Sequence, residues 1–454
     1  MTSTVTRPSA PESPVPAPET SRSGFLGLLQ LPVTLVRRVI SSARTTPGLL
    51  TVIAVGLVVL TLLTGLIGTL MVQQKITTTD QLITDREPQT AASEEVYRSL
   101  SDADATAAIA FLVTGPEPAV LRTRYDQDMA QAGAALAKAA ANATGDAATK
   151  VTTISQQLPS YAGLVATARA NNLQGFPVGA SYLQEASNLM RTTILPAAGD
   201  LYKMDTATLV AQQADAGGFP WFTAALLVCS LAALVVTQVF LTRRTNRLLN
   251  VGLVVASGGM VLVLMWGVVA LLVQSSLIGT GEDDGSRPVD LLVQARAAAV
   301  QARADETMTL VARGSGADYE TNFQQLAPLY LNWMQEAKGM LSGDAAAQVQ
   351  TAIVNSNNWL ATHKDLRAKD DGGDYVDAVK EAVDPSVPNN ASTFFDNVDA
   401  ALGKAVDDGR QEFVTNTNDG ENALTFLGPG IAVLAVVAAG GATIGIRDRL
   451  REYR

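Results

Sequence analysis

The chain has 454 residues, a formal net charge of −10, one cysteine and one histidine. This acidic balance disfavours nucleic acid and anionic lipid as partners of the polar regions, because like charges repel. A single cysteine excludes a disulfide within the chain, so the polar regions must be held together by a buried core. Metal and redox chemistry based on paired cysteines is also excluded.

From the N-terminus, residues 1–24 are rich in Thr, Ser, Pro and Glu and predict a disordered cytoplasmic tail. Residues 25–47 alternate Leu, Val and Ile with arginine, including Arg37 and Arg38. This pattern fits an amphipathic juxtamembrane segment on the inner leaflet. An apolar approach to the first membrane span is the alternative interpretation, and the residues leave both open.

Four apolar stretches, at residues 48–72, 218–242, 250–273 and 424–446, each reach the roughly 20 residues that a transmembrane helix needs. None of them contains Asp, Glu, Lys, Arg or His, which argues against an ion-coupled transporter. They do contain small residues, and Gly441 and Gly445 form a GxxxG pair that predicts close helix contact. Residues 428–430, Gly-Pro-Gly, predict a joint at the outer end of the fourth span.

Charge placement predicts the orientation of the spans. The N-terminal segment, the link at residues 243–249 and the tail at residues 447–454 carry +3, +3 and +2. The blocks at residues 73–217 and 274–423 hold 10 Lys/Arg against 15 Asp/Glu and 11 against 24. By the positive-inside rule, both termini and the link are cytoplasmic, and both blocks lie outside a plasma membrane that the chain crosses four times.

Each block predicts helices separated by short breaks. Residues 115–118, 144–146 and 175–177 interrupt the first block, and residues 314–316, 342–344 and 370–374 interrupt the second. Mostly apolar residues recur at alternating spacings of three and four along two rows, which we call seams. The first seam is Val151, Ile154, Leu158, Tyr161, Val165 and Ala168, and the second is Val349, Ala352, Ser356, Trp359, His363 and Leu366. Pro196 predicts a kink. The predicted fold is therefore all-α, with four transmembrane helices and two extracytoplasmic four-helix bundles.

The two blocks repeat one plan. Asp104 precedes Gly115 by eleven residues, and Asp305 precedes Gly316 by the same distance. The offset of 201 residues matches the separation of the first and third spans, which predicts an internal duplication.

Chemistry-bearing motifs are few. His363, in the second seam, fits a satisfied core histidine, with a pH-sensitive or ligand-facing group as the alternative. The acidic runs at residues 282–284 and 370–377 fit solvated turns better than calcium loops, since the second run lacks the closing glutamate of an EF-hand. We find no nucleophile motif, phosphate loop or metal-ligand cluster, so we expect neither an enzyme nor a cofactor or metal.

Arginines in the blocks are the candidate ligand-binding residues, because their planar forks suit carboxylates. The arginines are Arg98, Arg122 and Arg124 in the first block and Arg296 and Arg303 in the second, and Tyr97 is a further candidate in the first block. Solvated ion pairs are the alternative role for each.

On the inner side, the candidate output residues are Arg37 and Arg38 together with Arg243, Arg244 and Arg247 of the link. No kinase, HAMP-like or methylation module follows the spans, so we expect the output to pass to a separate protein.

Residues 95–106 (EVYRSLSDADAT), continuing to FLVTG at 111–115, resemble the four-helix sensor modules of chemoreceptors and histidine kinases. Two such blocks between four spans, with VARGSGADYE at 311–320, resemble an actinobacterial family of membrane signalling proteins of the GlnX type. This resemblance implies a relay between an amino-acid-binding lipoprotein outside and a Ser/Thr kinase of the kinase G type inside.

The leading hypothesis is a non-enzymatic transmembrane sensor or relay that passes an extracytoplasmic nutrient signal, such as an amino acid, to a cytoplasmic partner. Its two blocks would pack side by side, and the long helices entering the second and fourth spans would transmit a shift. The alternatives are a receptor that binds a small solute directly and a structural envelope scaffold.

Overall fold

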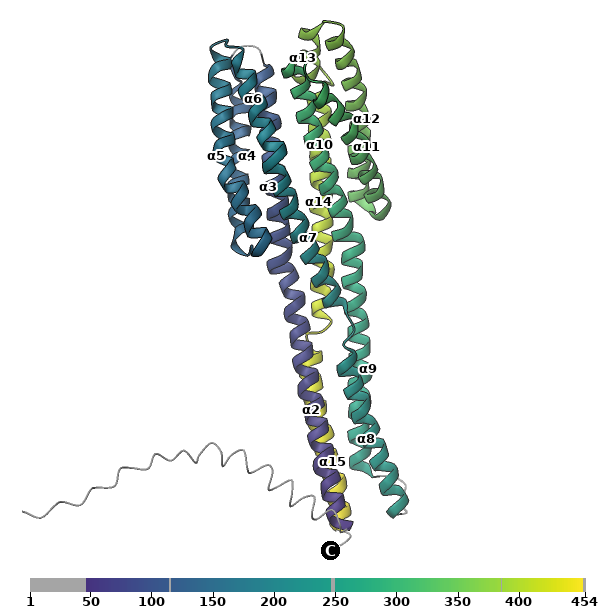
Figure 1. The fold of residues 1–454 in the computed structure, drawn as a ribbon. Helices are drawn as coiled ribbons and strands as arrows, with labels where there is room; N and C mark the ends of the chain where they lie inside the picture. Colours follow the sequence, from purple (N-terminus) through teal and green to yellow (C-terminus); the bar gives the residue numbers. More distant parts are fainter. Residues whose placement is uncertain (1–45, 114–115, 246–249, 385, 452–454) are drawn as a thin grey trace, which may run out of the picture. The chain divides into compact units, whose positions relative to one another are not determined.

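A computed structural model describes residues 46–113, 116–245, 250–384 and 386–451 (Figure 1). All regular structure in these ranges is helical, which confirms the predicted all-α class. The predicted tail and almost all of the predicted amphipathic segment lie outside the described residues. The chain forms two compact units, one of Met1–Leu66, Ala225–Leu262 and Ala432–Arg454, the other of Ile67–Ala224 and Val263–Ile431.

Four helices are long and apolar enough to cross a membrane, with mean hydropathies between 2.0 and 2.6. Their apolar stretches lie in α2 (Thr46–Gln81), α8 (Trp221–Thr245), α9 (Val251–Thr280) and α15 (Leu427–Arg451). These helices are consistent with a multi-pass membrane protein, as the hydropathy pattern predicted.

Small residues let α9 and α15 approach closely in the apolar unit. A Cβ atom on Gly252 would lie 2.3 Å from the carbonyl oxygen of Gly441, so only glycine fits there. One turn along, Asn250 donates through Nδ2 to the carbonyl of Gly445 at 2.6 Å. The close contact predicted from the GxxxG pair is therefore confirmed.

The polar unit contains two halves with the same order of helices. The first half consists of η1 (Leu82–Arg86), α3 (Glu87–Leu112), α4 (Ala119–Ala141), α5 (Gly145–Leu173), α6 (Val178–Leu189), η2 (Met190–Ile194) and α7 (Leu195–Gly217). The second half consists of η3 (Gly281–Ser286), α10 (Arg287–Ala312), α11 (Ala317–Met340), α12 (Gly343–Asp371), α13 (Tyr375–Val383) and α14 (Ala391–Asn422). Each predicted break overlaps a gap between two of these helices, although residues 145–146, 343–344 and 370–371 of those breaks are helical. The sequence analysis did not predict the break between α13 and α14.

Three π-helical segments, η1, η2 and η3, each lie just before a proline, at Pro88, Pro196 and Pro288. A proline lacks the N–H that would bond to the carbonyl four residues earlier, and its ring clashes with that carbonyl. A wider π-turn displaces the carbonyl and keeps the helix continuous. The kink predicted at Pro196 takes this form, and the acidic run at residues 282–284, predicted as a turn, lies in η3.

The long helices predicted to enter the second and fourth spans are the stretches Val178–Arg243 and Ala391–Asp448, and a short break interrupts each of them. α7 ends at Gly217 before α8 begins at Trp221, and α14 ends at Asn422 before α15 begins at Leu427. Pro220 accounts for the first break, and the Lys75 ammonium and the Gln274 amide cap the free carbonyl of Ala216. By contrast, α2 continues through η1 into α3, and α9 continues through η3 into α10.

The fourth span has its break at residues 423–426, upstream of the joint predicted at 428–430. Gly430 has another role, because a Cβ atom there would lie 2.3 Å from the Trp266 ring.

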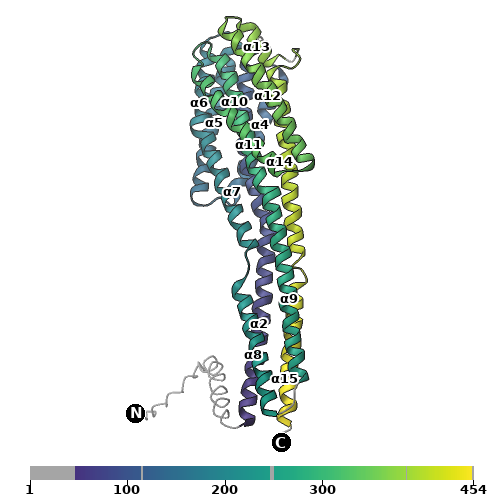
Figure 2. The same ribbon diagram turned by 90° about the vertical axis from the view of Figure 1, so that its right-hand side faces the viewer.

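The two halves pack against each other along α3 and α10 (Figures 1 and 2). All six seam residues that begin at Val349 are buried, and the seam from Val151 is buried or partly buried. The cores are not separate, however. Met308, Leu310 and Val311 of α10 belong to the core of the first half, and Tyr202 of α7 belongs to that of the second. The halves therefore form one continuous structure, joined by their first helices.

Candidate functional site

A large cleft of about 1190 Å³ lies between the two halves of the polar unit. The first half contributes α3 and α4, and the second contributes α10, α13 and α14. Much of its wall is apolar, with Ile109, Leu121 and Val311 among the lining residues, while Asp102 and Arg303 supply charge. A mostly apolar cleft with a few polar groups is the usual form of a small-molecule site.

Asp102 is the acid that lines this cleft from α3. Its Oδ2 accepts a hydrogen bond of 2.7 Å from Nη1 of Arg98, whereas its Oδ1 is buried and has no partner among the described residues. Burial, together with the nearby carboxylate of Asp399, raises the pKa of Asp102 to about 7. An unpaired buried oxygen is costly, so Asp102 is poised to accept a proton or a donor group.

Charged groups of both halves surround Asp102. Arg296 of α10 donates to both oxygens of Asp399 on α14, at 2.6 and 2.9 Å, and Arg124 of α4 reaches across to Asp396 at 3.4 Å. Carboxylates outnumber guanidiniums here, since the acids are Glu95, Asp102, Asp128, Asp396 and Asp399 and the bases are Arg98, Arg124 and Arg296. Acids therefore predominate around Asp102, whereas the wall of the cleft as a whole also contains Arg303, Arg313 and Lys380.

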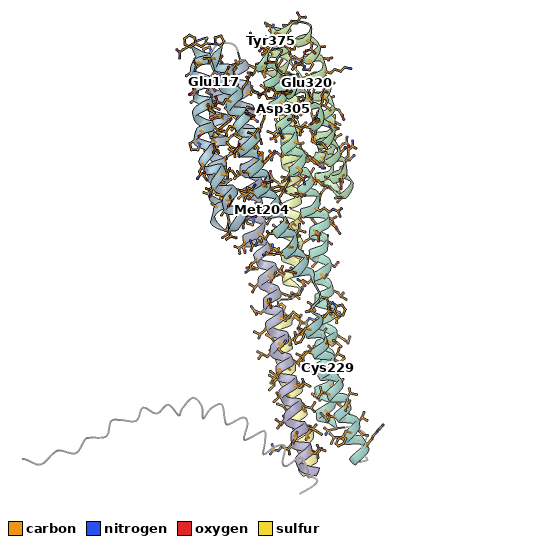
Figure 3. All side chains as sticks on the ribbon, viewed as in Figure 1. Glu117, Met204, Cys229, Asp305, Glu320 and Tyr375 are labelled. Carbon is orange, nitrogen blue, oxygen red and sulfur yellow. The ribbon has the colours of Figure 1, made fainter. Side chains whose placement is uncertain are left out.

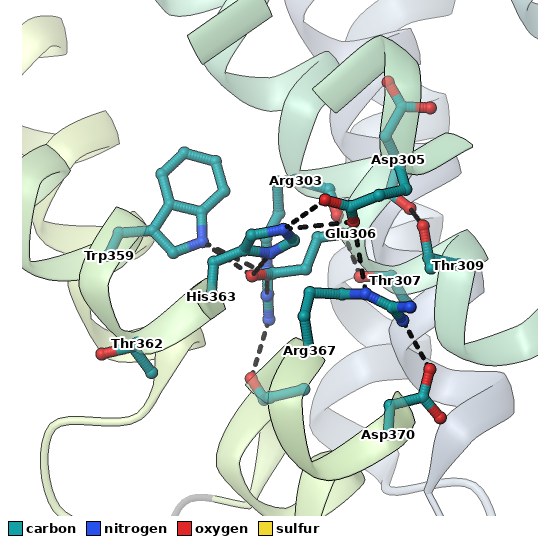
Figure 4. Close-up of polar contacts among 12 residues, drawn as sticks. Arg303, Asp305, Glu306, Thr307, Thr309, Trp359, Thr362, His363, Arg367 and Asp370 are labelled. Carbon is teal, nitrogen blue, oxygen red and sulfur yellow. Dashed lines mark hydrogen bonds and ion pairs between the residues drawn. The ribbon is translucent and has the colours of Figure 1, made fainter. Parts of the chain in front are cut away.

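Arg303 lines the cleft from α10 but is fully buried. Its guanidinium pairs with Glu306 and also donates to the carbonyl of Ala382 and to Ser392, as Figure 4 shows in part. Glu306 accepts further hydrogen bonds from Nε1 of Trp359 at 3.1 Å and from His363 (Figure 4). Both terminal nitrogens of Arg303 are therefore bound to groups of its own half, so its guanidinium is not free to pair with a ligand.

His363 lies between two carboxylates. Its Nδ1 is 2.9 Å from Oε1 of Glu306, its Nε2 is 3.3 Å from Oε1 of Glu320, and its ring stacks on Phe323. Burial opposes the charged form, but the hydrogen bonds to the two glutamates raise the pKa of His363 to about 9. His363 is thus a buried, satisfied cation, the first of the two predicted alternatives.

Comparison with known protein families gives a match in the first half of the polar unit. Residues 78–214 match the family model described as the actinobacterial sensor domain. This match supports an actinobacterial sensor family and suggests a signalling sensor role. No curated protein and no solved structure matches the chain.

The sensor-domain match covers η1 to α7, and so includes the Asp102 and Arg124 side of the cleft. It does not reach the second half, which supplies the opposite wall. A cleft built from both halves is therefore a feature of this chain as a whole.

The structure separates the predicted ligand-binding residues into three places. Arg124 and Arg303 line the cleft. Tyr97, Arg98 and Arg296 line a smaller cavity of about 210 Å³ between α3, α7, α10 and α11. Arg122 lies apart from both, exposed on α4 and paired with Glu117 at 2.9 Å.

Sequence reasoning missed Asp102 and Asp396 as site residues. Asp102 lies in the stretch that carries the family resemblance, so its pattern was visible but its unpaired oxygen was not. Asp396 becomes relevant only because the fold brings α14 to α4, and no local signal indicates that contact.

Of the predicted output residues, Arg37, Arg38 and Arg247 lie outside the described residues. Arg243 is exposed near the end of α8, and Arg244 follows it in the same helix. In the described ranges, no group of three or more His, Cys, Asp or Glu side chains is arranged to hold a metal ion.

Proposed function

We propose that this protein is a non-enzymatic, multi-pass membrane sensor that takes a small extracytoplasmic solute directly into the cleft between its halves. The observation that carries the proposal is the cleft itself, which both halves build and which contains a buried, half-satisfied carboxylate at Asp102. The sensor-domain match of the first half supports it independently.

The chemistry of the cleft favours a solute with an amine head and an apolar body. The free oxygen of Asp102 lacks a donor, and the surrounding excess of carboxylates stabilises an incoming ammonium. The apolar wall suits an aliphatic group, and Arg124, which is partly exposed, can pair with a carboxylate. An amino acid combines all three features, in agreement with the nutrient signal that the sequence suggests.

Direct binding is favoured over capture of a ligand-loaded lipoprotein, because a cleft of this size needs no second protein to enclose a solute. The lipoprotein and a cytoplasmic Ser/Thr kinase remain proposals that rest on the family resemblance. We place both termini on the cytoplasmic side from the charge pattern, and we propose that the output passes to a separate protein through the inner face.

Calorimetry on the full chain in nanodiscs tests this proposal. The probes are L-leucine, its deaminated analogue 4-methylpentanoate and its decarboxylated analogue 3-methylbutylamine, followed by the other common amino acids. We expect binding of amine-bearing probes by the wild type and loss of that binding in Asp102→Asn. Asp205→Asn is the matched control, because Asp205 is a buried acid of the same half that bonds to Gln89 and Ser93.

Two results would refute the proposal. One is the absence of binding across the whole panel by a folded wild-type chain. The other is equal binding by the two variants, which would place the solute elsewhere.

A further inference from the structure

A second position in the polar unit corresponds to the cleft when one half is laid on the other. Buried residues of α4 and α11 match at an offset of 198, as at Tyr125 and Phe323 or at Leu136 and Met334. By that offset, Leu121 and Arg124, which line the cleft, correspond to Tyr319 and Asn322.

The last helices of the two halves match in the same way. Met190 and Ile194 are buried like Ala391 and Phe395, which lie 201 residues later. At this offset Ser392, which also lines the cleft, corresponds to Arg191. The packing of α3 against α13 beside the cleft has its counterpart in the packing of α10 against α6.

In the structure these three counterparts meet at one point. The Arg191 guanidinium lies over the Tyr319 ring, 4.8 Å from its centroid, and pairs with Asp305. Asn322 donates to the other oxygen of Asp305 at 2.5 Å. Figure 3 labels Asp305 on α10, the helix that joins the halves. Arg191 comes from the first half, whereas Tyr319, Asn322 and Asp305 come from the second.

One difference between the two positions is the length of the side chain at Ser392 and Arg191. Serine is short, so the cleft beside Ser392 stays open, whereas the long arginine at the equivalent place extends into the counterpart position and fills it. An aromatic face combined with a fixed carboxylate suits a planar guanidinium better than an ammonium. Nε and Nη2 of Arg191 are buried without partners, so the side chain does not satisfy all its donors there.

We propose that Asp305, Tyr319 and Asn322 form a second binding site, selective for a guanidinium group, which Arg191 fills as a tethered ligand. This inference does not depend on the identity of the solute in the cleft. In the described residues the cleft beside Ser392 is therefore open, whereas Arg191 occupies the counterpart position between the halves.

The test replaces Arg191 in the full chain by serine (Arg191→Ser), because serine is the residue at the equivalent position, Ser392, beside the open cleft. N-ethylguanidinium, which restores the lost end of the arginine side chain, is the probe. We expect a lowered melting temperature for the variant and a saturable recovery with the probe, with a dissociation constant on the order of millimolar, as suits so small a fragment. The wild type should not respond, and n-propylammonium should not restore the variant.

Two further variants test whether the Asp305 carboxylate and the planar fork of Arg191 are required. Adding Asp305→Asn to Arg191→Ser should weaken the response to N-ethylguanidinium by about tenfold or more, since a charge-assisted hydrogen bond is lost. If Arg191→Ser does not fold, Arg191→Lys retains the charge without the planar fork and should melt below the wild type. A folded Arg191→Ser that binds no N-ethylguanidinium, or an Arg191→Lys that melts with the wild type, overturns the inference.

Discussion

The charged state of His363 predicts a loss of stability between pH 6.5 and 9. The pKa of this histidine is about 9 in the folded chain against 6.5 as the ordinary value, so the folded state holds the proton more tightly. Its contribution is fully present below pH 6.5 and is lost as the pH rises through 9. A difference of this size is worth about 3 kcal/mol, and the side chain is buried enough for most of it to count.

His363→Gln is the perturbation, because glutamine keeps hydrogen-bonding capacity and has no charge at any of these pH values. The assay is thermal unfolding of the full chain in detergent, measured for both proteins between pH 6 and pH 10. We expect the wild type to melt several degrees above the variant at pH 6, and this gap to close by pH 10.

The raised pKa values of Asp102, Asp128 and Asp305 lie at about 6 to 7, so these acids titrate in the lower part of this range. They are present in both proteins and cancel when the two melting curves are subtracted. A gap between wild type and His363→Gln that stays constant from pH 6.5 to pH 9 would refute the assigned charge of His363.

Three further predictions concern single positions. Asp102→Asn should raise the melting temperature at pH 8, because the pKa of about 7 marks a carboxylate whose ionised form is destabilised by burial, and the gain should shrink as the pH is lowered toward 4. Trp359→Phe, which removes a donor to a buried carboxylate, should cost about 1.5–3 kcal/mol in denaturant unfolding, whereas Trp333→Phe, on the same core, should cost less. Gly252→Ala should destabilise the apolar unit in a detergent melting assay, while Gly258→Ala, which has open space around its Cβ, should not.

The helix ends of the polar unit were predictable because their causes are local. Gly145, Gly175, Gly314 and Gly343 lie at or beside the ends of helices with positive φ values, a conformation that glycine adopts without strain. The seams were predictable for the same reason, since a stripe of apolar residues at spacings of three and four must face a core. The break between α13 and α14 was not among the breaks that the sequence analysis predicted.

The contacts that build the cleft were not predictable in this way. Arg124 and Asp396 are 272 residues apart, and Arg191 and Asp305 are 114 apart, so their meeting depends on how the halves pack. Charge patterning indicates that arginines in an acidic block will form ion pairs, but it does not indicate with which carboxylates. This is why the predicted arginines were divided among the cleft, the smaller cavity and the exposed surface of α4.

The position of the helix breaks bears on which elements can carry a signal. A continuous helix transmits rotation or translation along its axis, whereas a break in the helix absorbs part of it. Within the described residues, α2, η1 and α3 follow one another without a gap, as do α9, η3 and α10, and α3 and α10 both join the halves and line the cleft. Short breaks at residues 218–220 and 423–426 interrupt the helical stretches Val178–Arg243 and Ala391–Asp448, which contain the second and fourth predicted spans.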